Sequence, residues 1–145
     1  MDPALDPAMP DGRRVNTRAA AETARELLTK SSQNLNEVWR HCILQLFDDY
    51  SSSLRSSEPA HGLLLPEPPP TGDSRVDAAL AALTEHLARC DGWSPPAWVR
   101  DLNRYAQPSW FVAGLRSLEA TAIQESPLSF RKRGIFITAG ALSRR

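Results

Sequence analysis

The longest regular feature of the sequence is an apolar stripe that recurs every three or four residues between positions 35 and 54. Its members are Leu35, Val38, Trp39, Cys42, Ile43, Leu46, Phe47, Tyr50 and Leu54. This spacing places them on one side of an α-helix. Asn34 is in the N-cap position and Glu37 in the N3 position of a capping box. We therefore expect one helix from Leu35 to about Leu54, about 30 Å long, whose apolar face packs on a core or on a partner.

Two further segments also predict helices. Residues 17–30 are rich in alanine, glutamate, leucine and arginine, which are good helix formers. A later helix is capped by Asp73 or Ser74 and runs to about Cys90, with Gly92 as the residue that ends it. About half of the first hundred residues are thus predicted to be helical.

The last third of the chain predicts shorter elements. Ser94, followed by two prolines, begins a short helix, and residues 110–124 have helical spacing. Another helix begins at Ser126–Pro127 and stops at Gly134, and residues 135–138 are β-branched and apolar, as in a strand. The fold class is therefore mainly α: a single compact domain of five or six helices with one short extended segment near the C-terminus.

Two proline-containing segments are predicted to lie outside these elements. Residues 1–16 contain three prolines and no apolar period, so we expect a disordered leader, which starts at Met1 or Met9. The helical domain then spans 17–145, with a proline- and serine-rich connection at about 55–72. Residues 63–65, three leucines within this connection, are too apolar for a free linker and are expected to contact the core.

Charge and hydropathy exclude several classes of protein. The 17 basic and 17 acidic side chains balance, which argues against a uniformly basic nucleic-acid binder and against an acidic disordered chain. No apolar run approaches the roughly 20 residues of a membrane span. The N-terminal residues also lack the pattern of a secretory signal. We expect a cytoplasmic protein that does not bind membranes.

The charge is unevenly distributed along the chain. Residues 126–145 carry five cations and no acid, whereas residues 1–125 carry twelve cations and seventeen acids. A local basic patch of this kind attracts phosphate, anionic lipid or an acidic protein surface. Equally, cations in the last turn of a helix stabilise its dipole without any ligand.

Residues suited to catalysis or metal binding are sparse. His86 and Cys90 are four apart, a spacing that lets two side chains reach one zinc ion. His41 and Cys42 are adjacent and diverge on a helix, and Cys42 belongs to the apolar stripe. There is no nucleophile elbow and no phosphate-binding glycine loop. We predict no enzyme activity, no cofactor and no metal.

The aromatic and basic side chains are better candidates for binding another protein. Tryptophan, tyrosine and arginine are enriched at interfaces, although in a small domain aromatic residues first build the core. The candidate partner-binding residues are Trp39, Phe47, Tyr50, Trp110, Phe111, Arg131, Lys132 and Arg133.

Several motifs resemble one bacterial family. They are Pro68–Asp73, Val76–Ala88, Pro96–Val99, Glu125–Arg131 and Arg133–Leu142. Together they resemble the C-terminal module of actinobacterial helix-turn-helix regulators or antitoxins that are encoded beside nucleotidyltransferase-like proteins, over about residues 43–144. The resemblance implies an antitoxin-like role in a toxin–antitoxin system, with a nucleotidyltransferase-like toxin as partner and a part in transcription regulation. The residues before the match lack two short helices with a recognition face.

The leading hypothesis is therefore a non-catalytic protein-binding module, an antitoxin-like or accessory regulatory protein. One rival is a homodimer formed through the face of residues 35–54. The first alternative function is a DNA-associated transcription regulator that uses the basic C-terminal patch. The second is a small enzyme or a metal site.

Overall fold

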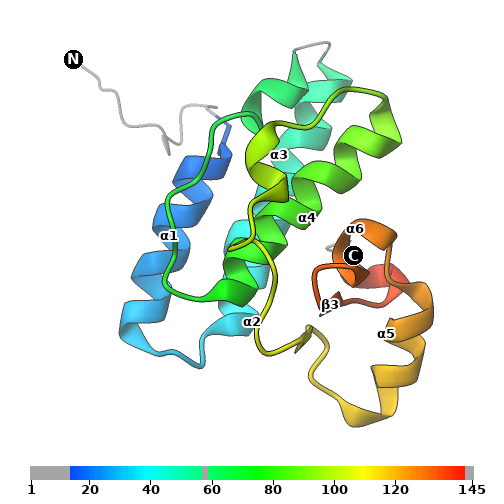
Figure 1. The fold of residues 1–145 in the computed structure, drawn as a ribbon. Coiled ribbons are helices and arrows are strands. Elements are labelled where there is room, and N and C mark those ends of the chain that lie inside the picture. Colours follow the sequence, from blue (N-terminus) through cyan, green and yellow to red (C-terminus); the bar gives the residue numbers. More distant parts are fainter. Residues whose placement is uncertain (1–13, 57–58, 143–145) are drawn as a thin grey trace.

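The computed structural model describes residues 14–56 and 59–142. Over these residues the chain is mainly helical, with one pair of two-residue strands, which confirms the predicted fold class (Figure 1). The α-helices and strands are α1 (Thr17–Lys30), α2 (Leu35–Val38), α3 (Leu44–Arg55), α4 (Ser74–Asp91), β2 (Trp110–Phe111), α5 (Glu119–Glu125), α6 (Leu128–Arg131) and β3 (Ile135–Phe136). The π-helical and 3₁₀ turns are η1 (Trp39–Ile43), η2 (Ala60–Leu63), η3 (Ala97–Arg100), η4 (Arg116–Leu118) and η5 (Ala139–Leu142).

Helix α1 confirms the helix expected at residues 17–30, and it buries its alanine-rich face against the core. The Asn16 side chain caps it by accepting a hydrogen bond from the Ala19 N–H at 2.9 Å. The Val15 N–H donates to Asp49 Oδ2 at 2.7 Å. Residues 14–16 therefore contact the folded domain, although they were expected in the leader, whereas residues 1–13 lie outside the described part.

The long amphipathic helix is present as a continuous path through α2, η1 and α3, from Leu35 to Arg55. Its expected capping box is wrong: the Asn34 side chain makes no cap bond and donates instead to the Leu27 carbonyl at 2.9 Å. Glu37 pairs with His41 at 3.1 Å. The apolar stripe faces α1 and α4 within the same chain, where its members Val38, Cys42, Ile43, Leu46 and Tyr50 are buried.

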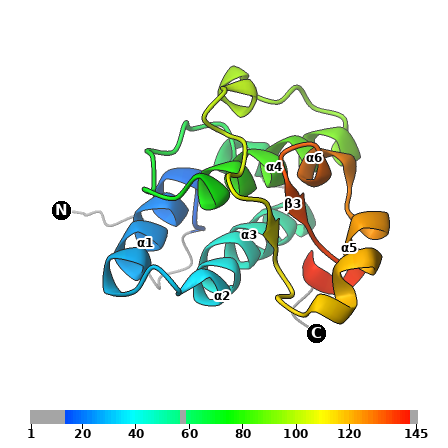
Figure 2. The ribbon, with the colours of Figure 1, turned by 60° about the horizontal axis from the view of Figure 1, so that its bottom comes forward.

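Helix α4 is the central element of the fold. It lies between α1 on one side and the C-terminal part with α5, α6 and β3 on the other, in both views (Figures 1 and 2). Asp73 caps its start by accepting from the Arg75 N–H at 2.9 Å, and Gly92 ends it with a left-handed φ of 78°. Residues 76–85 are all buried, as expected of a helix surrounded by protein.

The helix expected over residues 110–124 is wrong in its first half. Residues 110–111 form β2, which pairs in parallel with β3 so that Trp110 faces Ile135 and Phe111 faces Phe136. Gly114, with φ of 73°, then turns the chain before η4 and α5. Pairing with β3 satisfies the backbone N–H and C=O groups that a helix would satisfy within itself. The presence of this distant strand therefore decides that residues 110–111 are extended.

The other short elements are close to expectation. Strand β3 confirms the extended segment for residues 135–136, and α6 follows Ser126–Pro127 and precedes Gly134. The helix expected after Ser94 is only the 3₁₀ turn η3, which begins at Ala97.

The proline-rich connection is attached to the domain. Of its three consecutive leucines, Leu64 is fully buried, whereas Leu65 is exposed. The Leu65 carbonyl accepts a hydrogen bond from Trp98 Nε1 at 3.0 Å, and the Pro68 carbonyl accepts one from the buried Arg104 at 2.8 Å. Among the described residues, no helix combines the length and the apolar character that crossing a bilayer requires.

Candidate binding groove

Three of the aromatic residues expected at a partner surface are core residues instead. Trp39, Tyr50 and Trp110 are 6%, 1% and 5% exposed. The Trp39 ring meets the edges of Trp110 and Phe130 at centroid distances of 5.6 and 6.2 Å. A domain this small needs these rings for its own core, and the stripe of residues 35–54 is therefore no free dimer face.

The two phenylalanines among the candidates are half-buried. Phe47 packs against the main core cluster. Phe111 stacks on Phe136 at a centroid distance of 4.7 Å, which joins β2 to β3. Both rings are therefore already occupied by contacts within the chain.

Two of the three candidate basic residues are paired with a buried acid. The fully buried Arg133 donates from Nη1 to Glu85 Oε1 at 2.8 Å, and Lys132 Nζ lies 2.9 Å from the same oxygen. Arg133 also donates to the Ser129 and Val99 carbonyls. Arg133 and Lys132 thus hold α6 against α4. Within the expected basic element, Arg131 and Lys132 are exposed and Arg133 is buried. Residues 144 and 145, the other two cations, lie outside the described part.

The ionised form of Glu85 is favoured by folding. Burial by itself raises the pKa of Glu85, but hydrogen bonds from Arg133 and Lys132 outweigh burial and lower it from 4.5 to about 2. A carboxyl group with a lowered pKa contributes stability above its unfolded pKa and loses it as the pH falls through its folded pKa. We expect the difference in unfolding free energy between wild type and Glu85→Gln to narrow between about pH 5 and pH 2. Urea denaturation of both proteins at several pH values in this range measures the difference. A difference that stays constant with pH would contradict the prediction.

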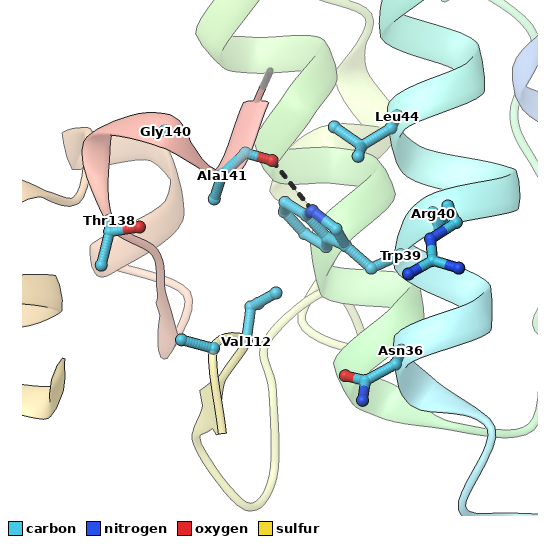
Figure 3. A pocket seen from close by; sticks show the side chains of 9 residues that line it. Asn36, Trp39, Arg40, Leu44, Val112, Thr138, Gly140 and Ala141 are labelled. Atoms are coloured by element: carbon cyan, nitrogen blue, oxygen red, sulfur yellow. Dashed lines mark hydrogen bonds between the residues drawn. The ribbon is translucent and has the colours of Figure 1, made fainter. Parts of the chain in front are cut away.

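A groove of about 650 Å³ lies between η1 and the C-terminal segment, residues 138–141 (Figure 3). Asn36 and Arg40 stand on one side of it, and Val112 and Thr138 stand on the other. The residues that line it are Asn36, Trp39, Arg40, Leu44, Val112, Ala113, Thr138, Gly140 and Ala141. The groove therefore joins residues about 100 positions apart in the sequence.

Trp39 connects the two walls of this groove. Its indole Nε1 donates to the Ala141 carbonyl at 3.0 Å (Figure 3). Arg40 is the one charged residue among those that line the groove, its side chain is 63% exposed, and Glu37 lies 3.9 Å from it. The groove thus offers apolar surface, two neutral polar side chains and one cation.

A second groove of about 520 Å³ lies between the end of α1 and the start of α4. Two of its lining residues, Thr71 and Asp73, already make hydrogen bonds at the start of α4. The Thr71 hydroxyl donates to the buried Asp77 carboxylate at 2.8 Å, and Asp73 is the N-cap. It is the weaker candidate because these two polar side chains are already engaged.

The residues suited to metal binding do not gather into a larger cluster. Within the described ranges, no group of three or more histidine, cysteine, aspartate or glutamate side chains is placed to hold a metal ion. His41 turns to Glu37 and away from Cys42, as expected from adjacent helical positions. His86 Nε2 and Cys90 Sγ lie 3.7 Å apart.

Of the groove residues, Trp39 alone was among the sequence candidates. Asn36 and Arg40 are polar residues four positions apart and lie outside the apolar stripe. Polar residues at this spacing are the ordinary pattern of a solvated helix face. Only their position in the wall of the groove, together with residues 138–141, distinguishes Asn36 and Arg40 from other solvated residues. No family model, curated protein or solved structure matches this chain.

Proposed function

We propose that this protein is a non-catalytic protein-binding module and that it holds a short segment of its partner in the groove beside Trp39. The observation that carries the proposal is the combination of apolar surface, hydrogen-bonding side chains and one cation in a single open groove. Peptide-recognition sites use apolar pockets for affinity and a few polar groups for orientation.

The charge of the groove favours a partner segment that contains an acidic residue. Arg40 is largely exposed and contacts Glu37 at 3.9 Å. Because a guanidinium carries five N–H donors, it can meet a second carboxylate beside Glu37. An aliphatic side chain would pack beside Leu44 and Val112, while a neighbouring carboxylate would approach the Arg40 guanidinium.

The antitoxin-like role implied by the family resemblance is compatible with this groove, with a nucleotidyltransferase-like protein as the partner. In this proposal the protein acts in the cytoplasm, where Cys42 and Cys90 form no disulfide. We favour a protein over DNA because Lys132 and Arg133 are engaged with Glu85.

Two glycines provide a matched test of the groove. Gly140 lines it, and Gly62 lies in a different 3₁₀ turn; a Cβ at either position meets nothing within 4 Å, and neither has a positive φ. A phenylalanine at Gly140 fills the groove, whereas Gly62→Phe adds the same ring elsewhere. Peptides selected from a phage-displayed random library on the wild-type protein serve as the probe.

We expect Gly140→Phe to weaken binding of the selected peptides at least about tenfold, equivalent to about 1.4 kcal/mol, as measured by fluorescence anisotropy. Gly62→Phe should leave their affinity unchanged, and the selected sequences should contain an acidic residue beside an aliphatic one. Equal binding by all three proteins would place the binding surface outside this groove.

A further inference from the structure

The exposed end of α4 carries a pair of soft metal ligands that the proposed groove does not use. His86 and Cys90 lie four residues apart on one helix face, with Nε2 and Sγ 3.7 Å apart. Zinc bonds to sulfur at about 2.3 Å and to nitrogen at about 2.0–2.1 Å, so two such ligands at a tetrahedral angle stand about 3.6 Å apart. The separation of the two atoms therefore matches a shared zinc ion, which would replace the direct contact between thiol and imidazole.

The surroundings of the pair suit a metal ligand. His86 is half-buried beside Cys90. The ring meets the edge of Phe130 at a centroid distance of 5.9 Å, a contact that limits its rotation. Residues 89–92, which include Cys90, are exposed, so a second molecule can approach.

The other cysteine is unsuited to this role. Cys42 is 1% exposed in the main core, and burial raises the pKa of its thiol to about 12. One chain thus supplies two ligands here, because the described residues contain no group of three potential metal ligands. Structural zinc sites take four protein ligands.

We propose that His86 and Cys90 form half of a zinc site that the same two residues of a second copy of this chain complete. A two-fold axis through the metal brings two imidazoles and two thiolates to one ion, a Cys₂His₂ set. Each Cys90 thiol releases its proton to solvent as its sulfur bonds to zinc, and the two thiolates balance the charge of Zn²⁺. Neither His86 nor Cys90 is among the residues that line the groove beside Trp39.

The test is zinc titration of the full chain in a non-thiol reductant, with mass measured by light scattering. We expect half an equivalent of zinc per chain, a doubling of mass that a chelator reverses, and cobalt–thiolate absorption when Co²⁺ replaces zinc. Cys90→Ser should raise the zinc Kd at least about 100-fold, since even outer-shell changes cost 10–100-fold, and should stay monomeric.

His41→Gln is the matched control because His41 also pairs with a residue four positions away on an exposed helix face. It should dimerise with zinc like the wild type. A mass that zinc does not change, one zinc per chain without dimerisation, or a zinc-dependent dimer that persists in Cys90→Ser would each overturn the proposal.

Discussion

Replacement of Glu85 by alanine is expected to lower the free energy of unfolding by about 3–5 kcal/mol, the usual cost of removing one partner from a buried ion pair. Glu85 is 6% exposed, and it is the carboxylate that both Arg133 and Lys132 contact. Without it, the fully buried Arg133 guanidinium keeps its two carbonyl acceptors but loses its counter-charge. Because this network joins α4 to α6, its loss should weaken the attachment of the C-terminal part.

Urea denaturation of the wild type, Glu85→Ala and two further variants measures this effect. Arg131→Ala is the control, because Arg131 is an exposed residue of the same basic run and is not one of the two cations paired with Glu85. Its replacement should change stability by no more than about 0.5 kcal/mol. Adding Arg133→Met to Glu85→Ala should recover part of the loss, since the uncompensated charge is gone. A loss below about 1 kcal/mol in Glu85→Ala would show that the pair does not stabilise the fold.

Replacement of Trp39 by alanine is expected to cost about 3–5 kcal/mol, because it removes a large buried ring. The ring lies between η1 and the C-terminal segment, where it contacts Trp110 and Phe130. The same change removes the hydrogen bond to the Ala141 carbonyl. This expectation distinguishes a core residue from a surface anchor, whose truncation would weaken binding and leave the folded state nearly as stable.

Trp39→Phe separates packing from hydrogen bonding. The smaller ring keeps most apolar contacts and loses the indole N–H, so a smaller cost, of about 1–2 kcal/mol, is expected. Thermal and urea unfolding of both variants provide the measurement. Wild-type stability in Trp39→Ala would contradict the core assignment and return Trp39 to the candidate anchors.

Much of the helical structure was predictable because its signals are local. The period of the apolar stripe predicts α2–α3, and Asp73 and Gly92 mark the two ends of α4. Capping and periodicity act between residues a few positions apart, so they can be recognised without knowing the fold. The antitoxin-like role and its partner stay predictions.

The failures concern residues whose partners are far away in the sequence. Residues 110–111 have helical spacing but form a strand, because β3 is there to pair with them. The run 131–133 has the composition of a basic patch, yet Arg133 is buried because Glu85, 48 positions earlier, neutralises it. Neither partner can be assigned from local pattern.

The sequence by itself thus determined a mainly α domain, its three long helical segments and the apolar faces that these segments must bury. The tertiary structure alone decided which aromatic rings became core, which cations stayed exposed, and that η1 and η5 would enclose a groove. The physical reason is distance along the chain: helix propensity and capping depend on near neighbours, whereas burial, ion pairing and grooves depend on which distant segments the packing brings together.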